Sequence, residues 1–131
     1  MPMDLKDRNK SFRGSLARSF LFALEGLTFV IRNERNIKIH LTLAIIMIGI
    51  SYWLQITKIE WIILFLLIGG MIVIEIINTA IENVVDLVTN EYHPLAKISK
   101  DVAAAAALVH AVMAVMVGVI LYTPYVLRLF E

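Results

Sequence analysis

Cysteine is absent from this sequence, and charged side chains are scarce. The lack of cysteine excludes disulfides, thiolate catalysis and cysteine-ligated metal sites. Charged residues make up 18% of the 131 positions and hydrophobic residues 60%, whereas a soluble domain has about 25% and about 45–50%, respectively. So much apolar surface excludes a soluble globular enzyme and a disordered tail. It predicts one small polytopic membrane domain over residues 1–131.

Three long apolar runs dominate the chain, at residues 37–54, 59–88 and 102–125. The second run would extend about 45 Å as a helix, longer than a hydrocarbon core of about 30 Å, so its C-terminal part is expected to project from the bilayer. A tight turn at residues 55–58 separates the first two runs. A polar loop at residues 89–101 is expected before the third. The sequence therefore predicts an all-α membrane protein with three transmembrane helices.

An amphipathic helix is expected before these spans, at residues 11–31. Arg13, Arg18 and Glu25 interrupt the segment, so it cannot cross a bilayer. One interpretation is a surface helix in the membrane interface, with its cations near anionic headgroups. The alternative is a helix packed on the protein's own helical bundle. The apolar stripe, with steps of three and four residues, consists of Phe12, Leu16, Phe20, Leu24, Leu27 and Ile31.

The basic residues are distributed unevenly along the chain. With three spans, the N-terminus and the 89–101 loop share one side of the membrane and carry ten of the 12 Lys and Arg residues. The other side has Lys58 and Arg128. The positive-inside rule places the basic side in the cytoplasm. We therefore expect a multi-pass protein of the inner (plasma) membrane with a cytoplasmic N-terminus.

Four polar residues recur within the second run: Glu75, Asn78, Glu82 and Asp86. At about 100° per residue they fall within an arc of about 80° on one face of a helix. An ionisable side chain at the bilayer centre costs about 2.5–3.5 kcal/mol. The stripe therefore cannot face lipid. Its acids must be bound by something or lie near the interface.

Several functions fit such a stripe. It could join helices by buried hydrogen bonds, although three acids and an amide exceed what that role needs. Converging carboxylates are hard oxygen ligands suited to Mg²⁺, and a desolvated carboxylate can act as a general base. Proton or cation conduction is also open. Glu34, Lys100 and Asp101 are expected at the depth of Glu82 and Asp86, and no P-loop or Gly-rich phosphate loop is present. The residues themselves indicate a cytoplasm-facing, Mg²⁺-binding site at the membrane surface.

Three separated motifs resemble the small prokaryotic membrane kinases of the diacylglycerol kinase family. They are EIINTAIENVVD at residues 75–86, NERNIKIHL at residues 33–41 and PLAKISKDVAA at residues 94–104. The likeness extends over residues 13–121. The last two motifs are most similar to the Gram-positive branch, which mostly phosphorylates undecaprenol. Ala105 departs from the glycine expected in that branch, which puts local packing or nucleotide access in doubt but not the class.

The resemblance implies a homotrimer with sites at subunit contacts, and it implies roles for individual residues. Glu75 would be the base that deprotonates the lipid hydroxyl, and Asn78 would orient the catalytic end. Glu34 and Glu82 would hold Mg²⁺ on the ATP phosphates. Lys100 would contact phosphate and Asp101 the nucleotide. No role follows for Asp86. The residues implied near the adenosine are Glu91, Tyr92 and His93.

The expected activity is that of a lipid kinase, dependent on ATP and Mg²⁺ and acting on undecaprenol, with diacylglycerol as the alternative acceptor. The competing hypothesis is a small proton-coupled transporter that uses Glu75 and Glu82. No nucleic-acid partner is expected. Outside the site, we interpret His110 as a packing residue with satisfied hydrogen bonds, and the Gly69-Gly70 pair as a place of close helix contact.

Overall fold

The computed structural model describes the backbone of residues 5–130 and the side chains of residues 16–130. This part of the chain consists of four helices and contains no strand, which confirms the all-α fold. Residues 1–33 form one compact unit and residues 34–131 another, and each is described by itself. The helices are α1 (Leu5–Asn33), α2 (Arg35–Leu54), α3 (Lys58–Val88) and α4 (Pro94–Arg128).

The first unit is the single helix α1, which begins six residues earlier than predicted. Within the expected apolar stripe, Leu16, Phe20 and Leu24 are exposed, whereas Phe12 lies outside the residues whose side chains are described. Polar side chains near the end of the helix bond to its own backbone: the Thr28 hydroxyl donates to the Leu24 carbonyl at 2.7 Å. The Thr28 hydroxyl is therefore satisfied within the helix itself.

A short turn at residues 55–57 joins α2 to α3, as the sequence predicted. Gln55 ends α2 in the left-handed conformation, with φ of 53°, and its backbone N–H bonds back to α2 carbonyls. Thr57 then begins α3 with a capping box: its hydroxyl accepts from the Glu60 N–H while the Glu60 carboxylate accepts from the Thr57 N–H. Because both helix ends satisfy their own backbone groups, the turn can be very short.

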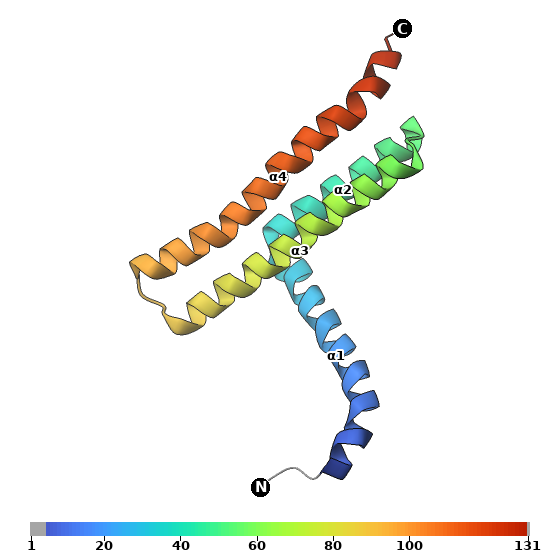
Figure 1. The fold of residues 1–131 in the computed structure, drawn as a ribbon. Helices are drawn as coiled ribbons and strands as arrows, with labels where there is room; N and C mark the ends of the chain where they lie inside the picture. The colour runs from blue at the N-terminus through green and yellow to red at the C-terminus, as the bar shows by residue number, and fades with distance from the viewer. Residues whose placement is uncertain (1–4, 131) are drawn as a thin grey trace. The chain divides into compact units, whose positions relative to one another are not determined.

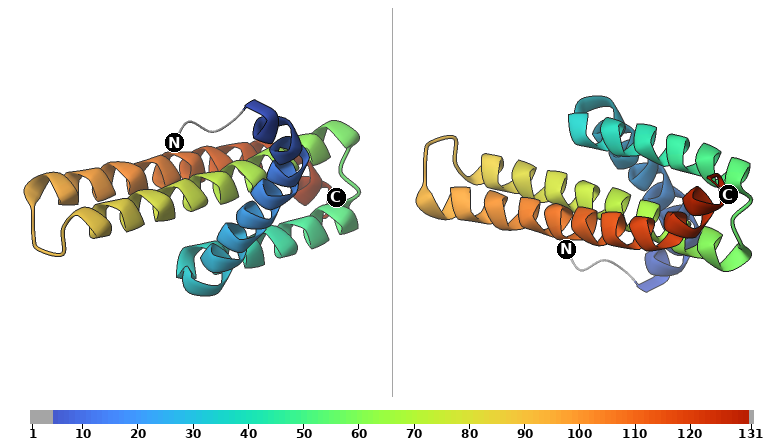
Figure 2. Two further views of the ribbon diagram at one scale, coloured as in Figure 1. Left: turned by 90° about the horizontal axis from the view of Figure 1, so that it is seen from below. Right: turned by 90° about the horizontal axis from the view of Figure 1, so that it is seen from above.

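Helices α3 and α4 lie side by side and antiparallel, connected by residues 89–93 (Figures 1 and 2). The loop predicted over residues 89–101 exists only over residues 89–93; its second half was wrongly predicted, because α4 already begins at Pro94. Proline is favoured in the first turn of a helix. His93 caps the helix by accepting from the Leu95 N–H at 3.2 Å, and Lys97 pairs with Asp101 one turn later. These local contacts extend the helix into a polar stretch.

His110 on α4 lies against Gly70 on α3. Its Nε2 atom is 2.9 Å from the Leu67 carbonyl oxygen. A Cβ atom added at Gly70 would lie 2.6 Å from the His110 ring, whereas one at Gly69 would meet nothing within 4 Å. The interpretations of His110 as a packing residue and of the glycine pair as a close contact are therefore confirmed, with Gly70 as the residue that permits the approach.

The end of the bundle near the α2–α3 turn is held by apolar packing and two polar contacts. Ile56, Leu64 and Leu121 form a buried cluster there. The Ser51 and Tyr122 hydroxyls lie 2.5 Å apart and link α2 to α4. The Tyr125 hydroxyl donates to the Glu60 carboxylate at 2.6 Å and links α4 to α3.

Helices α2, α3 and α4 are each long and apolar enough to cross a membrane. They contain 20, 31 and 35 residues. Because α2 is the shortest, the end of α3 and the beginning of α4 extend beyond it (Figure 2). This extension carries most of the polar residues that the sequence singled out.

Candidate active site

The polar stripe of α3 runs from the buried part of the bundle to its open end. Glu75 and Asn78 are buried, with 4% and 8% of their surface exposed, Glu82 is half-buried and Asp86 is exposed. The Thr79 hydroxyl donates to the Glu75 carbonyl at 3.0 Å and is buried with them. The first two residues of the stripe thus face the protein interior, as the helical arc predicted.

Glu75 is held against α2 by a residue that was not among the predicted site residues. The Nε2 atom of His40 lies 3.4 Å from the Glu75 Oε1 atom. A buried carboxylate requires such a partner, because an unpaired charge away from water is very costly. The signal was present in the sequence: the two residues lie at comparable distances on either side of the α2–α3 turn, so an antiparallel hairpin brings them together.

Asn78 links the buried part of the stripe to Glu82. Its Nδ2 atom donates to the Glu82 Oε1 atom at 2.9 Å, which fixes the orientation of the amide. Its Oδ1 atom is buried and has no hydrogen-bond partner among the described residues. Most buried polar atoms in proteins are satisfied. This oxygen is therefore available to a donor or cation supplied from outside the chain.

The exposed end of the stripe contacts α4. Lys100 Nζ lies 2.6 Å from Asp86 Oδ1, and Lys97 Nζ lies 2.5 Å from Asp101 Oδ2. Asp86, to which the sequence assigned no role, therefore orients the Lys100 ammonium across the two helices. Asp101 instead pairs within its own helix.

The α3–α4 connection borders a hollow of about 500 Å³. The hollow brings together residues of the end of α3, the connection and the beginning of α4. Four of the five predicted nucleotide-binding residues of this region contribute to its lining, and Asp101 does not. The ring of Tyr92 is freely accessible, since the residue is 82% exposed. The predicted residues in the lining are Glu91, Tyr92, His93 and Lys100, together with Asp86.

Glu34 is the residue directly before α2, and it is half-buried. His40 on α2 lies opposite Glu75 on the antiparallel α3. Glu34 precedes His40 by six residues, so it is at about the level of residue 81 on α3. Glu34 thus lies near the level of Glu82. Among the residues that the structure describes, however, no three His, Asp or Glu side chains converge as a group of potential metal ligands.

Known proteins are similar in sequence to this chain over most of its length. The family model for prokaryotic diacylglycerol kinase matches residues 21–122. An undecaprenol kinase of Bacillus subtilis is 43% identical over 93% of this chain and 98% of its own length. Diacylglycerol kinases of Synechocystis sp. and Escherichia coli are 38% and 31% identical, over 88% and 76% of this chain and 66% and 82% of their own lengths. The chain therefore belongs to the prokaryotic diacylglycerol kinase family.

Proposed function

We propose that this protein transfers the γ-phosphate of ATP to the hydroxyl of a membrane lipid alcohol. Undecaprenol is the first candidate for this acceptor. The observation that carries the proposal is the buried Glu75, held by His40 about one turn from the unpaired Asn78 oxygen. The 43% identity to a Bacillus subtilis undecaprenol kinase supports undecaprenol as the acceptor. Diacylglycerol is the second candidate, because the other relatives are named for it.

In this proposal Glu75 is the general base. A carboxylate that is largely removed from water and oriented by a neighbouring group suits proton abstraction from a hydroxyl. His40 supplies the orienting contact at 3.4 Å. Glu75 would accept the hydroxyl proton as the lipid oxygen attacks the γ-phosphorus, and the bond to the β-phosphate oxygen would break with ADP as the leaving group. Phosphoryl transfer depends mainly on such positioning and on charge neutralisation.

Glu34 and Glu82 are the proposed ligands of Mg²⁺. The metal usually takes one or two protein carboxylates and completes its coordination with substrate phosphates and water, so two carboxylates at a similar level fit it without a cage of three. Bound Mg²⁺ would neutralise charge on the ATP phosphates. Asn78 fixes the Glu82 carboxylate through its Nδ2 donor, and its Oδ1 atom can accept from a bound water or from the acceptor hydroxyl.

The hollow at the α3–α4 connection is the proposed nucleotide site. Lys100 supplies a cation for phosphate, and Asp86 orients it. Asp101 would contact the nucleotide from the next turn of α4. Glu91 and His93 would surround the adenosine, and the exposed ring of Tyr92 could stack on the base, since aromatic rings bind flat π-systems favourably. The open position of the hollow, beyond the first residues of α2, suits a water-soluble substrate.

We also propose a cytoplasmic N-terminus, an active site on the cytoplasmic side of the plasma membrane, and a homotrimer. The charge asymmetry of the chain supports the orientation. Exposed small residues on α4, Ala104 to Ala106, support close packing with another copy, because small side chains let membrane helices approach. The proposed trimer would complete each site with residues of a neighbouring subunit.

The test is a phosphotransfer assay with purified protein, labelled ATP, Mg²⁺ and each lipid in turn. Undecaprenol should become labelled fastest, and omission of Mg²⁺ should abolish labelling. No transfer to undecaprenol or diacylglycerol would overturn the proposal. Ion flux through liposomes containing the protein, in the absence of transfer, would instead support a transporter.

A further inference from the structure

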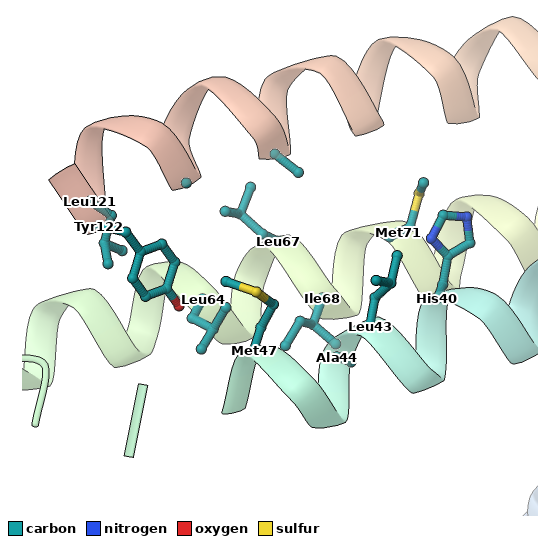
Figure 3. Close-up of a pocket in the computed structure, with 12 residues that line it drawn as sticks. His40, Leu43, Ala44, Met47, Leu64, Leu67, Ile68, Met71, Leu121 and Tyr122 are labelled. Atoms are coloured by element: carbon teal, nitrogen blue, oxygen red, sulfur yellow. The ribbon is translucent and has the colours of Figure 1, made fainter. Parts of the chain in front are cut away.

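An apolar cavity of about 150 Å³ lies between α2, α3 and α4. His40 and Met71 are at one end of it, and Leu121 and Tyr122 are at the other (Figure 3). Its walls between these ends are formed by aliphatic and thioether side chains and by two small residues of α4, Ala114 and Gly118. None of the proposed catalytic or metal-binding residues lines it.

The dimensions of the cavity suit a single hydrocarbon chain. Leu64 and Met71, both in its wall, are separated by about 10 Å along α3. A helix, about 10–12 Å across, is too wide to enter. Apolar cavities of about this volume stay dry and accept small hydrocarbons.

The two ends of the cavity differ chemically. The Tyr122 hydroxyl is already bonded to the fully buried Ser51 at 2.5 Å, so that end presents no unsatisfied polar group and suits a hydrocarbon. At the opposite end, His40 borders the cavity and also contacts the Glu75 carboxylate at 3.4 Å. A ligand that fits both ends is amphiphilic, with its polar group at His40.

We propose that this cavity binds the hydrocarbon chain next to the hydroxyl of the acceptor lipid and directs that hydroxyl towards His40 and Glu75. The inference rests on the proposed function for the identity of the acceptor, and it assigns the chain-binding site to the space between three helices of one subunit. The ligand class is a long-chain alcohol. The segment nearest the hydroxyl occupies the cavity, and the rest of the chain extends into the surrounding lipid.

Filling the cavity from Gly118 tests the proposal. A Cβ atom at Gly118 meets nothing within 4 Å, so the backbone there has room for the first atom of a side chain. In mixed micelles, Gly118→Leu should raise the KM for undecaprenol about tenfold, equivalent to about 1.4 kcal/mol, and leave the KM for ATP unchanged. The increase should grow through Gly118→Ala, Gly118→Val and Gly118→Leu. Gly49→Leu on α2 is the matched control, since it also meets nothing within 4 Å and lies outside the cavity wall.

An unchanged KM for undecaprenol in Gly118→Leu, or an equal increase in Gly49→Leu, would overturn the inference. So would a change in oligomeric mass with an unchanged KM, which would identify a second copy as the occupant. If wild-type protein transfers phosphate to neither lipid, the proposed function itself fails. If wild-type protein is active and the Gly118 series behaves normally, only the chain-binding site fails.

A measurement on wild-type protein covers the case in which the Gly118 variants do not fold. An undecaprenol analogue with a diazirine close to its hydroxyl should, on irradiation, attach to residues at the His40 end of the cavity wall, such as Leu43 or Met71. Peptide mass spectrometry identifies the attachment. Labelling confined to exposed faces, for example at Ile45 or Val115, would overturn the inference.

Discussion

At the scale of single residues, the environment of Glu75 separates it from the other acids of the stripe. Asp86 is paired at an exposed position, whereas Glu75 is buried beside a histidine. Exposed pairs contribute little to stability, about 0–1 kcal/mol. A buried acid is costly and persists where it has a use. Burial thus distinguishes the proposed base from the residues that only orient other groups.

The first prediction concerns the base. Glu75→Gln keeps the size and polarity of the side chain but cannot accept the hydroxyl proton, so kcat should fall by about 10²–10⁴-fold. Nucleotide affinity, measured by binding of a fluorescent ATP analogue with Mg²⁺, should be nearly that of the wild type. Appreciable turnover in this variant would remove Glu75 as the base.

The second prediction concerns His40. His40→Ala should lower kcat by about 10- to 100-fold, because the Glu75 carboxylate loses its orienting contact, while the KM for ATP should not change. His40→Gln retains an N–H donor at similar reach and should recover part of the loss. A role in folding alone would reduce the amount of active protein without this recovery by glutamine, so the two variants distinguish positioning from stability.

The sequence could predict which residues share one face of a helix, but not what each face contacts. Helical periodicity placed Glu75, Asn78 and Glu82 together, because that relation depends on geometry within one helix. The contacts of His40 with Glu75 and of Lys100 with Asp86 cross between helices. Such contacts depend on register and rotation, and side-chain packing decides both.

At the scale of whole elements, the close approach of α3 and α4 depends on one glycine. Gly70 leaves room for the His110 ring, and the adjacent Gly69 faces open space. The sequence predicted a close contact at the pair but could not choose between its members. It also placed the start of α4 too late, because hydropathy marks where a helix becomes apolar and not where it begins, and the first turns of α4 are stabilised by a cap and an ion pair.

The third prediction compares these two glycines. Gly70→Ala should destabilise the protein by about 1–3 kcal/mol, because its methyl group forces the His110 ring out of place. Gly69→Ala should be neutral or stabilising by up to about 1 kcal/mol, since alanine is the better helix former. Thermal unfolding in detergent measures both. Equal stability of the two variants would contradict the packing described for His110.

The fourth prediction compares two lysines one turn apart on α4. Lys100→Met should raise the KM for ATP about tenfold, as loss of a charge-assisted phosphate contact implies. Lys97 also borders the hollow, but it pairs with Asp101 within α4. Lys97→Met removes the same charge, and its effect should be several-fold smaller. Similar KM values for the two variants would show that general electrostatic attraction, and not a direct contact of Lys100, binds the nucleotide.

At the scale of the whole molecule, one chain provides the site residues but does not enclose them. No three acidic or histidine side chains converge among the described residues, and only 6% of the most apolar stretch of α4 is buried within the chain. In a bilayer, such exposure is compatible with lipid contact. Exposed alanines beside a polar stripe nevertheless favour a neighbouring helix, because small residues permit close packing and the polar groups then gain partners.

The last prediction follows from the proposed trimer with sites shared between subunits. At ATP concentrations well below the wild-type KM, Glu75→Gln should be nearly inactive alone, and Lys100→Ala should retain about a tenth of the wild-type activity, as its tenfold higher KM implies. After mixing in denaturing detergent and reassembly at equal amounts, about a quarter of the wild-type activity should return, because in a cyclic arrangement one subunit with intact Glu75 must precede one with intact Lys100. Light scattering of the purified protein should give the mass of three chains. If the mixture is no more active than the average of the two variants while the mass is trimeric, Glu75 and Lys100 of the same subunit serve one site.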